Sequence, residues 1–333
     1  MPQLRKDPII GRWVIIATAR AKRPQDFNHL SEEKPEITAE GPCPFCPGHE
    51  HLDKEIIAYR KGGPPNSPNW WVRVIPDKYP VVKREGPLNK YGEGMYDRME
   101  GVGSHEIVIC SPEHNITLAE LPVSQFREIL WAYRERFLAL KLEKYIKHIL
   151  VVHNYGRQAG GWMRHPHSQL VALPVIPKTI KEETEGARRY YKYKERCIYC
   201  DIIREEMRSP QERVIFKDHS FIALTPFASR SPFEVCILPR RHSPSFEEIK
   251  ESEITKLAEI MKNILEQIKN VLDDPSYNLI LHSAPFAKSP LPYYHWHIEI
   301  KPALVHLAGF EWGTGFYINP TPPEEAAKYL RGD

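Results

Sequence analysis

Two C-x-x-C pairs constrain the fold of this chain more than any other feature of its sequence. Cys43 and Cys46 form the first pair, and Cys197 and Cys200 form the second. Each pair is followed by a histidine that ends a strand-like run, and a second histidine comes at nearly the same distance beyond it in both halves: His114 and His165, then His242 and His295. This repeated order predicts a duplicated domain with loop insertions.

Each half also predicts a long amphipathic helix followed by strands. Apolar residues at helical spacing run from Ser124 to His148 and from Ser245 to Leu272, where Ser245 and Glu248 indicate a capping box. Strand-like runs follow, ILVVHN in the first half and YNLILHS in the second. We therefore predict an α+β fold of two tandem duplicated domains, residues 1–178 and 179–333, each an antiparallel sheet with a packed helix. The charged stretch at the boundary is interpreted as a solvated linker.

Composition excludes several classes of protein. The 333 residues include 46 basic and 43 acidic side chains, a formal charge of +3, whereas proteins that bind nucleic-acid phosphates usually carry a larger basic excess. No apolar run approaches the length of a membrane-spanning helix, and the N-terminus lacks the apolar stretch of a secretory signal. We therefore expect a cytoplasmic protein that binds neither nucleic acid nor a membrane.

The cysteine pairs and their histidines predict two metal sites. Zinc prefers thiolate and imidazole ligands in a tetrahedral shell, and two cysteines on one tight turn supply half of that shell. Four protein ligands leave no open position, so we predict two structural zinc ions per chain and no organic cofactor. The expected sets are Cys43, Cys46, His114 and His165, and Cys197, Cys200, His242 and His295. A redox role for the pairs would need a thioredoxin-like βαβ unit, which the pattern lacks.

The other cysteines and several histidines need no functional role. Cys110 and Cys236 lie inside apolar strand patterns and are interpreted as small core residues. Four histidines are interpreted as surface or hydrogen-bonded groups: His29, His49, His51 and His148.

The segment HPHSQ predicts a nucleophile. Side chains alternate along a strand, so His165, His167 and Gln169 share one face, with the two histidines roughly 7 Å apart. If zinc holds His165, His167 stays fixed beside it with its ring free to attack phosphorus. Gln169 offers an amide donor for a phosphoryl oxygen whose charge grows in the transition state.

A glycine-rich segment precedes the predicted nucleophile. Asn154 is followed by Gly156, Gly160 and Gly161, and glycines let backbone N–H groups approach a phosphate closely. Most glycine-rich loops are simply turns, so this segment indicates a phosphate site only because the predicted nucleophile follows it.

These motifs identify a resemblance that covers nearly the whole chain. The sequence resembles galactose-1-phosphate uridylyltransferase, in the histidine-triad superfamily. The matching segments include CPFC, PDKYPVV, GVGSHEIVICSPEHNITLAEL, HNYGRQAGG, HPHSQ, PFEVCILPRRH, HWHIEI and GFEWGTGFYINPTPPEEAA. The resemblance implies tandem histidine-triad-like domains and a homodimer with active sites near the subunit interface.

The resemblance also implies a two-step exchange. UDP-glucose would give its uridylyl group to His167 and release glucose-1-phosphate, and galactose-1-phosphate would then take the group to form UDP-galactose. Gln169, where triad hydrolases carry a third histidine, fits the transferase branch. The residues implied to contact substrate are Arg20 and Arg23, apparently from the partner subunit, Asp77 and Lys78 at the uridine, Asn154, Gly160, Gly161 and Gln169 at the phosphates and ribose, and Glu311 at the sugar.

The sequence departs from the family pattern at three places. Trp162 stands where a phosphate-binding serine is expected, so Arg164 or Ser168 is predicted to take over that role. Val305 and His306 replace the lysine and phenylalanine used on the sugar phosphate. Some family members bind a second metal through a glutamate and three histidines, here Glu183, His282, His295 and His297; we favour the cysteine-based second site because softer thiolates outcompete a carboxylate for zinc.

Two other functions stay open. PDKYP equally resembles relatives that act on ADP-glucose, so the chain could be an ADP-glucose or broad-specificity nucleotidyl-sugar phosphorylase. A zinc-organised nucleic-acid-binding module is the alternative from another class, and the near-neutral charge balance disfavours it.

Overall fold

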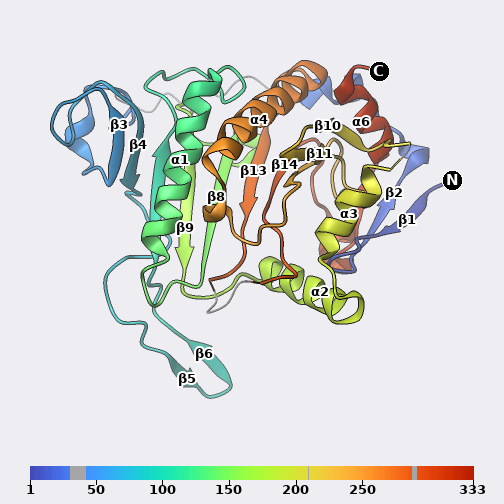
Figure 1. Cartoon of the computed structure of the whole chain (residues 1–333), viewed down its shortest axis with the longest axis horizontal. Coiled ribbons are helices and arrows are strands. Elements are labelled where there is room, and N and C mark those ends of the chain that lie inside the picture. The colour runs from blue at the N-terminus through green and yellow to red at the C-terminus, as the bar shows by residue number, and fades with distance from the viewer. Residues whose placement is uncertain (31–42, 209, 287–290) are drawn as a thin grey trace.

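One antiparallel sheet of ten strands runs through the whole molecule (Figure 1). The computed structural model describes residues 1–30, 43–208, 210–286 and 291–333. Across the sheet the strands follow the order β10 (Val214–Lys217), β11 (Phe221–Leu224), β12 (Val235–Pro239), β14 (His297–Pro302), β13 (Tyr277–His282), β8 (His148–Tyr155), β9 (His167–Leu173), β7 (Ser104–Ile109), β4 (Trp70–Pro76) and β3 (Ile57–Arg60). All of its neighbouring strands pair antiparallel.

The sheet is built from two half-sheets that repeat one strand order. Outward from the centre, β8-β9-β7-β4-β3 comes from the first half of the chain, and β13-β14-β12-β11-β10 comes from the second. The halves join where β8 pairs with β13, with Val152 opposite Ile280. The predicted α+β class is therefore confirmed, with the two antiparallel half-sheets merged into one.

Two long helices cover one face of this sheet, and they lie against each other (Figure 1). They are α1 (Val123–Leu140) and α4 (Glu251–Leu272). The buried face of α1 consists largely of the apolar positions that the helical spacing predicts, from Phe126 to Leu140, and α4 buries a similar stripe. These side chains form one core with the strands, so burial of two amphipathic faces holds the two halves together.

Both helices differ from their predicted bounds. α1 ends at Leu140, because a turn leads into the strand that starts at His148. The predicted capping box of Ser245 and Glu248 is wrong: Ser245 precedes a separate 3₁₀ turn, Phe246–Glu248, and α4 starts only after Lys250. The backbone N–H of Lys250 instead donates to the Glu253 carboxylate (2.9 Å).

The predicted linker is in fact a helix, α2 (Lys178–Lys194). It buries Ile180, Glu183 and Ala187. Ala187 packs with apolar residues of the second half and with Ile9, and Glu183 bonds His282 and Tyr294. At Gly186 a Cβ atom would come within 1.9 Å of the carbonyl oxygen of Ile9, so only glycine permits this approach. The helix α3 (Ile198–Glu206) follows, with Cys197 just before its first turn.

The remaining elements lie at the edges. A small sheet joins β1 (Gln3–Lys6), β2 (Trp13–Ile16) and β15 (Tyr317–Asn319) beside α6 (Pro323–Arg331), and α5 (Gly309–Thr314) precedes β15. The hairpin of β5 (Tyr91–Glu93) and β6 (Tyr96–Arg98) projects from the body (Figure 1). In the part of the chain described, no helix combines the length and the apolarity needed to cross a bilayer.

Several minor predictions can now be compared with the fold. Cys110 is buried, and Cys236 lies half-buried in β12. His51 is exposed, and His49 is half-buried. The side chain of His29 lies outside the described residues. The prediction for His148 is wrong: its ring is buried, and neither nitrogen meets a hydrogen-bond partner among the described residues, so burial lowers its pKa to about 3.

Candidate active site and metal centres

The first cysteine pair and its two histidines converge as the sequence predicts. Cys46 Sγ lies 3.4 Å from His114 Nδ1 and 3.6 Å from His165 Nδ1, and Cys43 Sγ lies 3.7 Å from His165 Nδ1. A tetrahedral zinc ion bonded to sulfur and nitrogen places those two atoms about 3.6 Å apart. The four side chains therefore fit zinc, with the cysteines on the loop that precedes β3, His114 on the loop after β7 and His165 just before β9.

The second set repeats this arrangement in the other half. Cys200 Sγ lies 3.4 Å from His242 Nδ1 and 3.7 Å from His295 Nδ1, and Cys197 belongs to the same group. Both cysteines lie at the start of α3, and the two histidines follow β12 and precede β14. This set also fits zinc.

One histidine in each set is oriented by a backbone carbonyl. His165 Nε2 donates to the carbonyl of Ser111 (2.7 Å), and His295 Nε2 donates to the carbonyl of Pro239 (2.7 Å). Each bond places the proton on Nε2 and leaves the Nδ1 lone pair facing the cysteines. The two halves thus hold their candidate metal ligands in the same tautomer.

His167 lies two residues beyond His165, at the first position of β9. Its Nδ1 donates to the carbonyl of His165 (2.8 Å), which leaves the Nε2 lone pair uncommitted to that bond. Burial lowers the pKa of His167, so the ring is neutral at pH 7. The ring of Phe45, between the two cysteines of CPFC, lies 5.4 Å from the ring of His167 and helps to fix it. A neutral, oriented imidazole is suited to nucleophilic attack.

Gln169 is oriented by a residue that sequence reasoning missed, His105. The Val81 N–H donates to His105 Nδ1 (3.3 Å), so the ring proton is on Nε2. That Nε2 lies 3.2 Å from Gln169 Oε1 and 3.4 Å from Asp77 Oδ2. Because the amide oxygen accepts from His105, the Gln169 NH₂ group remains a donor for a substrate oxygen. His105 lies on β7, where it pairs with Val171 of β9. Its contact with Gln169 depends on the register of these two strands, so the sequence alone does not reveal it.

We expect His105→Ala to lower kcat by about 10-fold while the KM of the donor changes little, because the Gln169 amide loses its orientation. His105→Gln keeps an N–H donor and is expected to restore most of the rate. His51→Ala, at an exposed histidine, is the matched control. Steady-state kinetics on the three variants check this prediction; equal losses in His105→Ala and His105→Gln would contradict it.

Asn154 and the glycine-rich turn lie at the end of β8. Asn278 donates through its amide nitrogen to Asn154 Oδ1 (2.8 Å), so the Asn154 NH₂ group is left to donate elsewhere. Gly160 has a positive φ of 81°, and a Cβ at Gly161 would lie 2.6 Å from the carbonyl oxygen of Asn154. Both positions therefore need glycine for backbone reasons.

Other predicted substrate contacts come from elements outside the half-sheet that holds His167. Arg20 and Arg23 are exposed beside β2, and Glu311 belongs to α5 just before β15. These elements adjoin the second-half edge of the large sheet, whereas β9 lies in the first half (Figure 1). Lys78 is exposed next to Asp77, at the end of β4.

Ser168 and Arg164, which are predicted to replace the phosphate-binding serine of the family, lie in different surroundings. Ser168 is fully buried and bonds Tyr133 Oη (2.6 Å) and His153 Nδ1 (3.2 Å), so it faces away from His167 and cannot reach a phosphate. Trp162 is 68% exposed, and Arg164 is exposed nearby. Val305 is half-buried and His306 is exposed, after β14.

The alternative second-metal set is divided by the structure. His295 joins the cysteine set, whereas Glu183, His282 and His297 gather separately with Glu299. The reason is local: His295 lies two residues before β14 begins at His297, and the carbonyl of Pro239 holds the ring of His295 toward Cys200.

Comparisons with known proteins agree along the whole chain. Residues 1–177 match the model of the N-terminal domain of galactose-1-phosphate uridyl transferase, and residues 183–313 match that of its C-terminal domain. The chain is 37% identical to ADP-glucose phosphorylase of Arabidopsis thaliana, covering 99% of this chain and 92% of that protein. It is 29% identical to galactose-1-phosphate uridylyltransferase of Thermotoga maritima, covering 99% and 98%.

Solved structures give the same result. A crystal structure of Arabidopsis thaliana ADP-glucose phosphorylase with bound ADP-glucose superposes with a TM-score of 0.83 at 34% identity, covering 100% of this chain and 99% of that one. A uridylyltransferase structure superposes with a TM-score of 0.78 at 30% identity, covering 100% and 98%. The matching family models, the relatives and the shared fold show that the chain belongs to the galactose-1-phosphate uridylyltransferase family.

Proposed function

We propose that this chain moves a uridylyl group from UDP-glucose to galactose-1-phosphate through a covalent uridylyl-His167 intermediate. The observation that carries the proposal is the state of His167, whose Nδ1 is committed to the His165 carbonyl and whose ring is neutral. Nε2 can therefore attack without a separate base. Relatives named as galactose-1-phosphate uridylyltransferases support the reaction.

The proposed reaction consists of two successive displacements at the α-phosphorus of the nucleotide. Nε2 of His167 forms a bond to phosphorus while the bond to the oxygen of glucose-1-phosphate breaks, and glucose-1-phosphate leaves. A phosphate oxygen of galactose-1-phosphate then attacks the same phosphorus, and the N–P bond breaks to regenerate neutral His167. In both steps the Gln169 NH₂ group would donate to a phosphoryl oxygen whose charge increases in the transition state.

The other substrate contacts follow from their positions. Asn154 and the backbone at Gly160 and Gly161 would hold phosphate or ribose, and Asp77 and Lys78 would contact the base. For Asp77, this role is supported by its contact with His105, whose ring also contacts Gln169. Zinc ions in the two Cys/His sets would be structural, since each set supplies four ligands and leaves none open to substrate.

An ADP-glucose phosphorylase is the second candidate, since a relative of that name is 37% identical over nearly the whole chain. The test compares UDP-glucose and ADP-glucose as donors, each with galactose-1-phosphate and with inorganic phosphate as acceptor. We expect UDP-glucose with galactose-1-phosphate to give the highest kcat/KM. Turnover confined to ADP-glucose would overturn the uridylyl assignment but would leave the His167 mechanism intact.

We also propose a homodimer in which Arg20, Arg23 and Glu311 serve the active site of the partner subunit. Their placement next to the small sheet of β2 and β15, outside the half-sheet that holds His167, supports this arrangement. Mixing inactive Arg20→Ala/Arg23→Ala chains with inactive His167→Gly chains should then restore activity, because one site of each mixed dimer is intact. Random exchange predicts about a quarter of the wild-type activity. No recovery in dimers shown to have exchanged subunits would contradict the proposal.

A further inference from the structure

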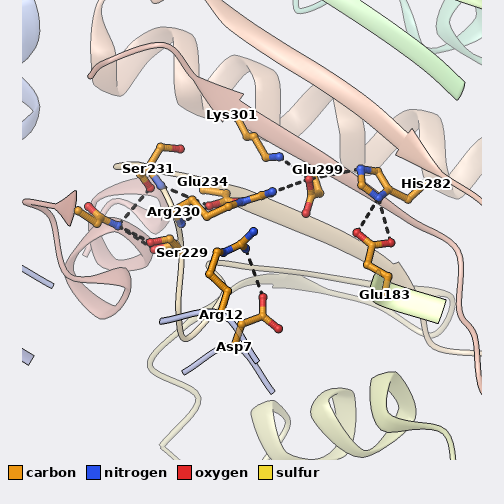
Figure 2. A network of polar contacts seen from close by, with 11 residues as sticks. Asp7, Arg12, Glu183, Ser229, Arg230, Ser231, Glu234, His282, Glu299 and Lys301 are labelled. Carbon is orange, nitrogen blue, oxygen red and sulfur yellow. Dashed lines mark hydrogen bonds and ion pairs between the residues drawn. The ribbon is translucent and has the colours of Figure 1, made fainter. Parts of the chain in front are cut away.

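A third group of metal-ligating side chains lies apart from the two Cys/His sets. It comprises Glu183 of α2, His282 of β13, and His297 and Glu299 of β14, with their ligating atoms within 4.8 Å of one another. The distances alone would suit a metal ion. Figure 2 shows Glu183, His282 and Glu299 together with the cationic side chains that surround them.

His282 is held between two carboxylates, one at each ring nitrogen. Its Nδ1 lies 3.0 and 3.2 Å from the two oxygens of Glu183, and its Nε2 lies 3.4 Å from Glu299 Oε2. A carboxylate accepts, so the Nδ1 that faces Glu183 carries a proton, and the second carboxylate beside Nε2 favours the imidazolium, which has no lone pair for a metal. Burial lowers the pKa of His282, but Glu183 and Glu299 outweigh this effect and raise it above the ordinary value.

Glu299 is already occupied by two cations of the chain. Arg230 lies 2.6 Å and Lys301 Nζ lies 2.5 Å from the same oxygen, Oε2 (Figure 2). Arg230 also bonds Glu234 Oε1 at 2.6 Å. With His282 protonated, three positive side chains balance the three carboxylates of Glu183, Glu234 and Glu299. A divalent ion bound by His282 would have to displace the His282 proton and would leave this buried group with one uncompensated positive charge, which is unfavourable.

This third group, the centre around His282, lies in the second half at the position that corresponds to the candidate active site in the first half. In the second half His282 lies opposite His297. In the first half Val152 lies opposite Gln169, and the same register continued by two residues places Asn154 opposite His167. The positions of Asn154, His167 and Gln169 therefore correspond to His282, His297 and Glu299. The same fold position holds neutral amides beside the nucleophile in one half and charged groups in the other.

We propose that this centre is a metal-free ion-pair cluster in which Arg230 and Lys301 take the place of a metal ion, so that the second half binds one ion only, at its cysteine set. The cluster joins α2, β13, β14 and the loop that holds Arg230 and Glu234, and it closes the site that corresponds to the active site. The Tyr294 hydroxyl adds a bond to Glu183 Oε2 (2.8 Å).

The test is metal quantification on the full-length protein after dialysis against Zn²⁺, Fe²⁺ or Mn²⁺, with anomalous diffraction to locate each bound ion. We expect anomalous peaks at the two Cys/His sets and none between Glu183 and Glu299. A peak between Glu183 and Glu299 with any of the three ions would overturn the proposal. Because this result needs no substrate, it is independent of the proposed reaction.

A double variant tests whether the two cations exclude the ion. Arg230→Met/Lys301→Met leaves the carboxylates uncompensated, and we expect it to bind one additional ion per chain and to gain thermal stability when that ion is added. Arg208→Met/Lys256→Met, which removes two exposed ion pairs, is the matched control and should bind no additional ion. A folded double variant without the additional ion would overturn the role of Arg230 and Lys301. If the double variant does not fold, the wild-type anomalous maps still decide the proposal.

Discussion

Replacing His167 with glycine is expected to abolish nucleotidyl transfer, with a loss of roughly 10⁴-fold or more, as for other enzymes that lose their nucleophile. The substitution removes Nε2, the atom that would bond to phosphorus, and leaves the candidate zinc ligand His165 in place. The measurement is protein labelling by UDP-glucose that carries a radioactive α-phosphate. The wild type should hold a label that is labile in acid, stable in base and discharged by galactose-1-phosphate.

The controls separate mechanism from donor preference. ADP-glucose labelled in the same position is tested in parallel. If the enzyme uses ADP-glucose as its donor, the covalent intermediate is then still detected. His51→Gly, at an exposed histidine, should label like the wild type. A stable label in His167→Gly, or no label in the wild type with either donor, would disprove the covalent mechanism.

Loss of the first metal set is expected to have the second-largest effect. Cys46 lies within 3.6 Å of both histidines of that set, so Cys46→Ser removes a ligand from its middle. Structural zinc contributes roughly 10–16 kcal/mol of apparent binding free energy in small peptide systems, so the unfolding free energy should fall by several kcal/mol. Activity per folded molecule should fall as well, because His165, two residues before His167, loses its anchor.

The second metal set supplies the comparison. Cys200→Ser removes the corresponding ligand beside His242 and His295. It should lower stability to a similar extent but leave activity per folded molecule nearly unchanged, since His167 lies in the other half. Thermal unfolding, zinc content and kcat are measured on both variants. The assigned roles would be contradicted if Cys46→Ser lost its zinc but kept the stability of the wild type. They would also be contradicted if both variants lost the same fraction of kcat per folded molecule.

Local patterns made much of this site predictable. A C-x-x-C pair needs only a tight turn to present two thiolates, so spacing alone predicted both Cys/His sets that the structure brings together. H-x-H on a strand places both rings on one face, so the same spacing predicts His167 as a nucleophile beside His165. The apolar stripes of α1 and α4 were predictable for the same reason, because helical periodicity is local. The family resemblance then supplied the proposed reaction.

Other features depend on contacts between distant segments. The linker prediction failed at α2 because its polar sequence conceals one narrow buried face, with Gly186 against Ile9. His105 and Glu299 lie in segments that match the family, but no local pattern assigns them a role, because their partners come from other strands. The Ser168 prediction failed because alternation along β9 turns that hydroxyl toward Tyr133.

The sequence by itself determined the duplicated order of elements and the two Cys/His sets, and it predicted His167 as the nucleophile, since each depends on spacing within one half. Only the tertiary structure decided that the two half-sheets merge at β8 and β13, that His105 orients Gln169, and that His295 belongs to the cysteine set. It also decided that Arg230 and Lys301 neutralise the acidic group around His282. Those outcomes depend on strand register and on the charge balance of a buried space, which no local pattern encodes.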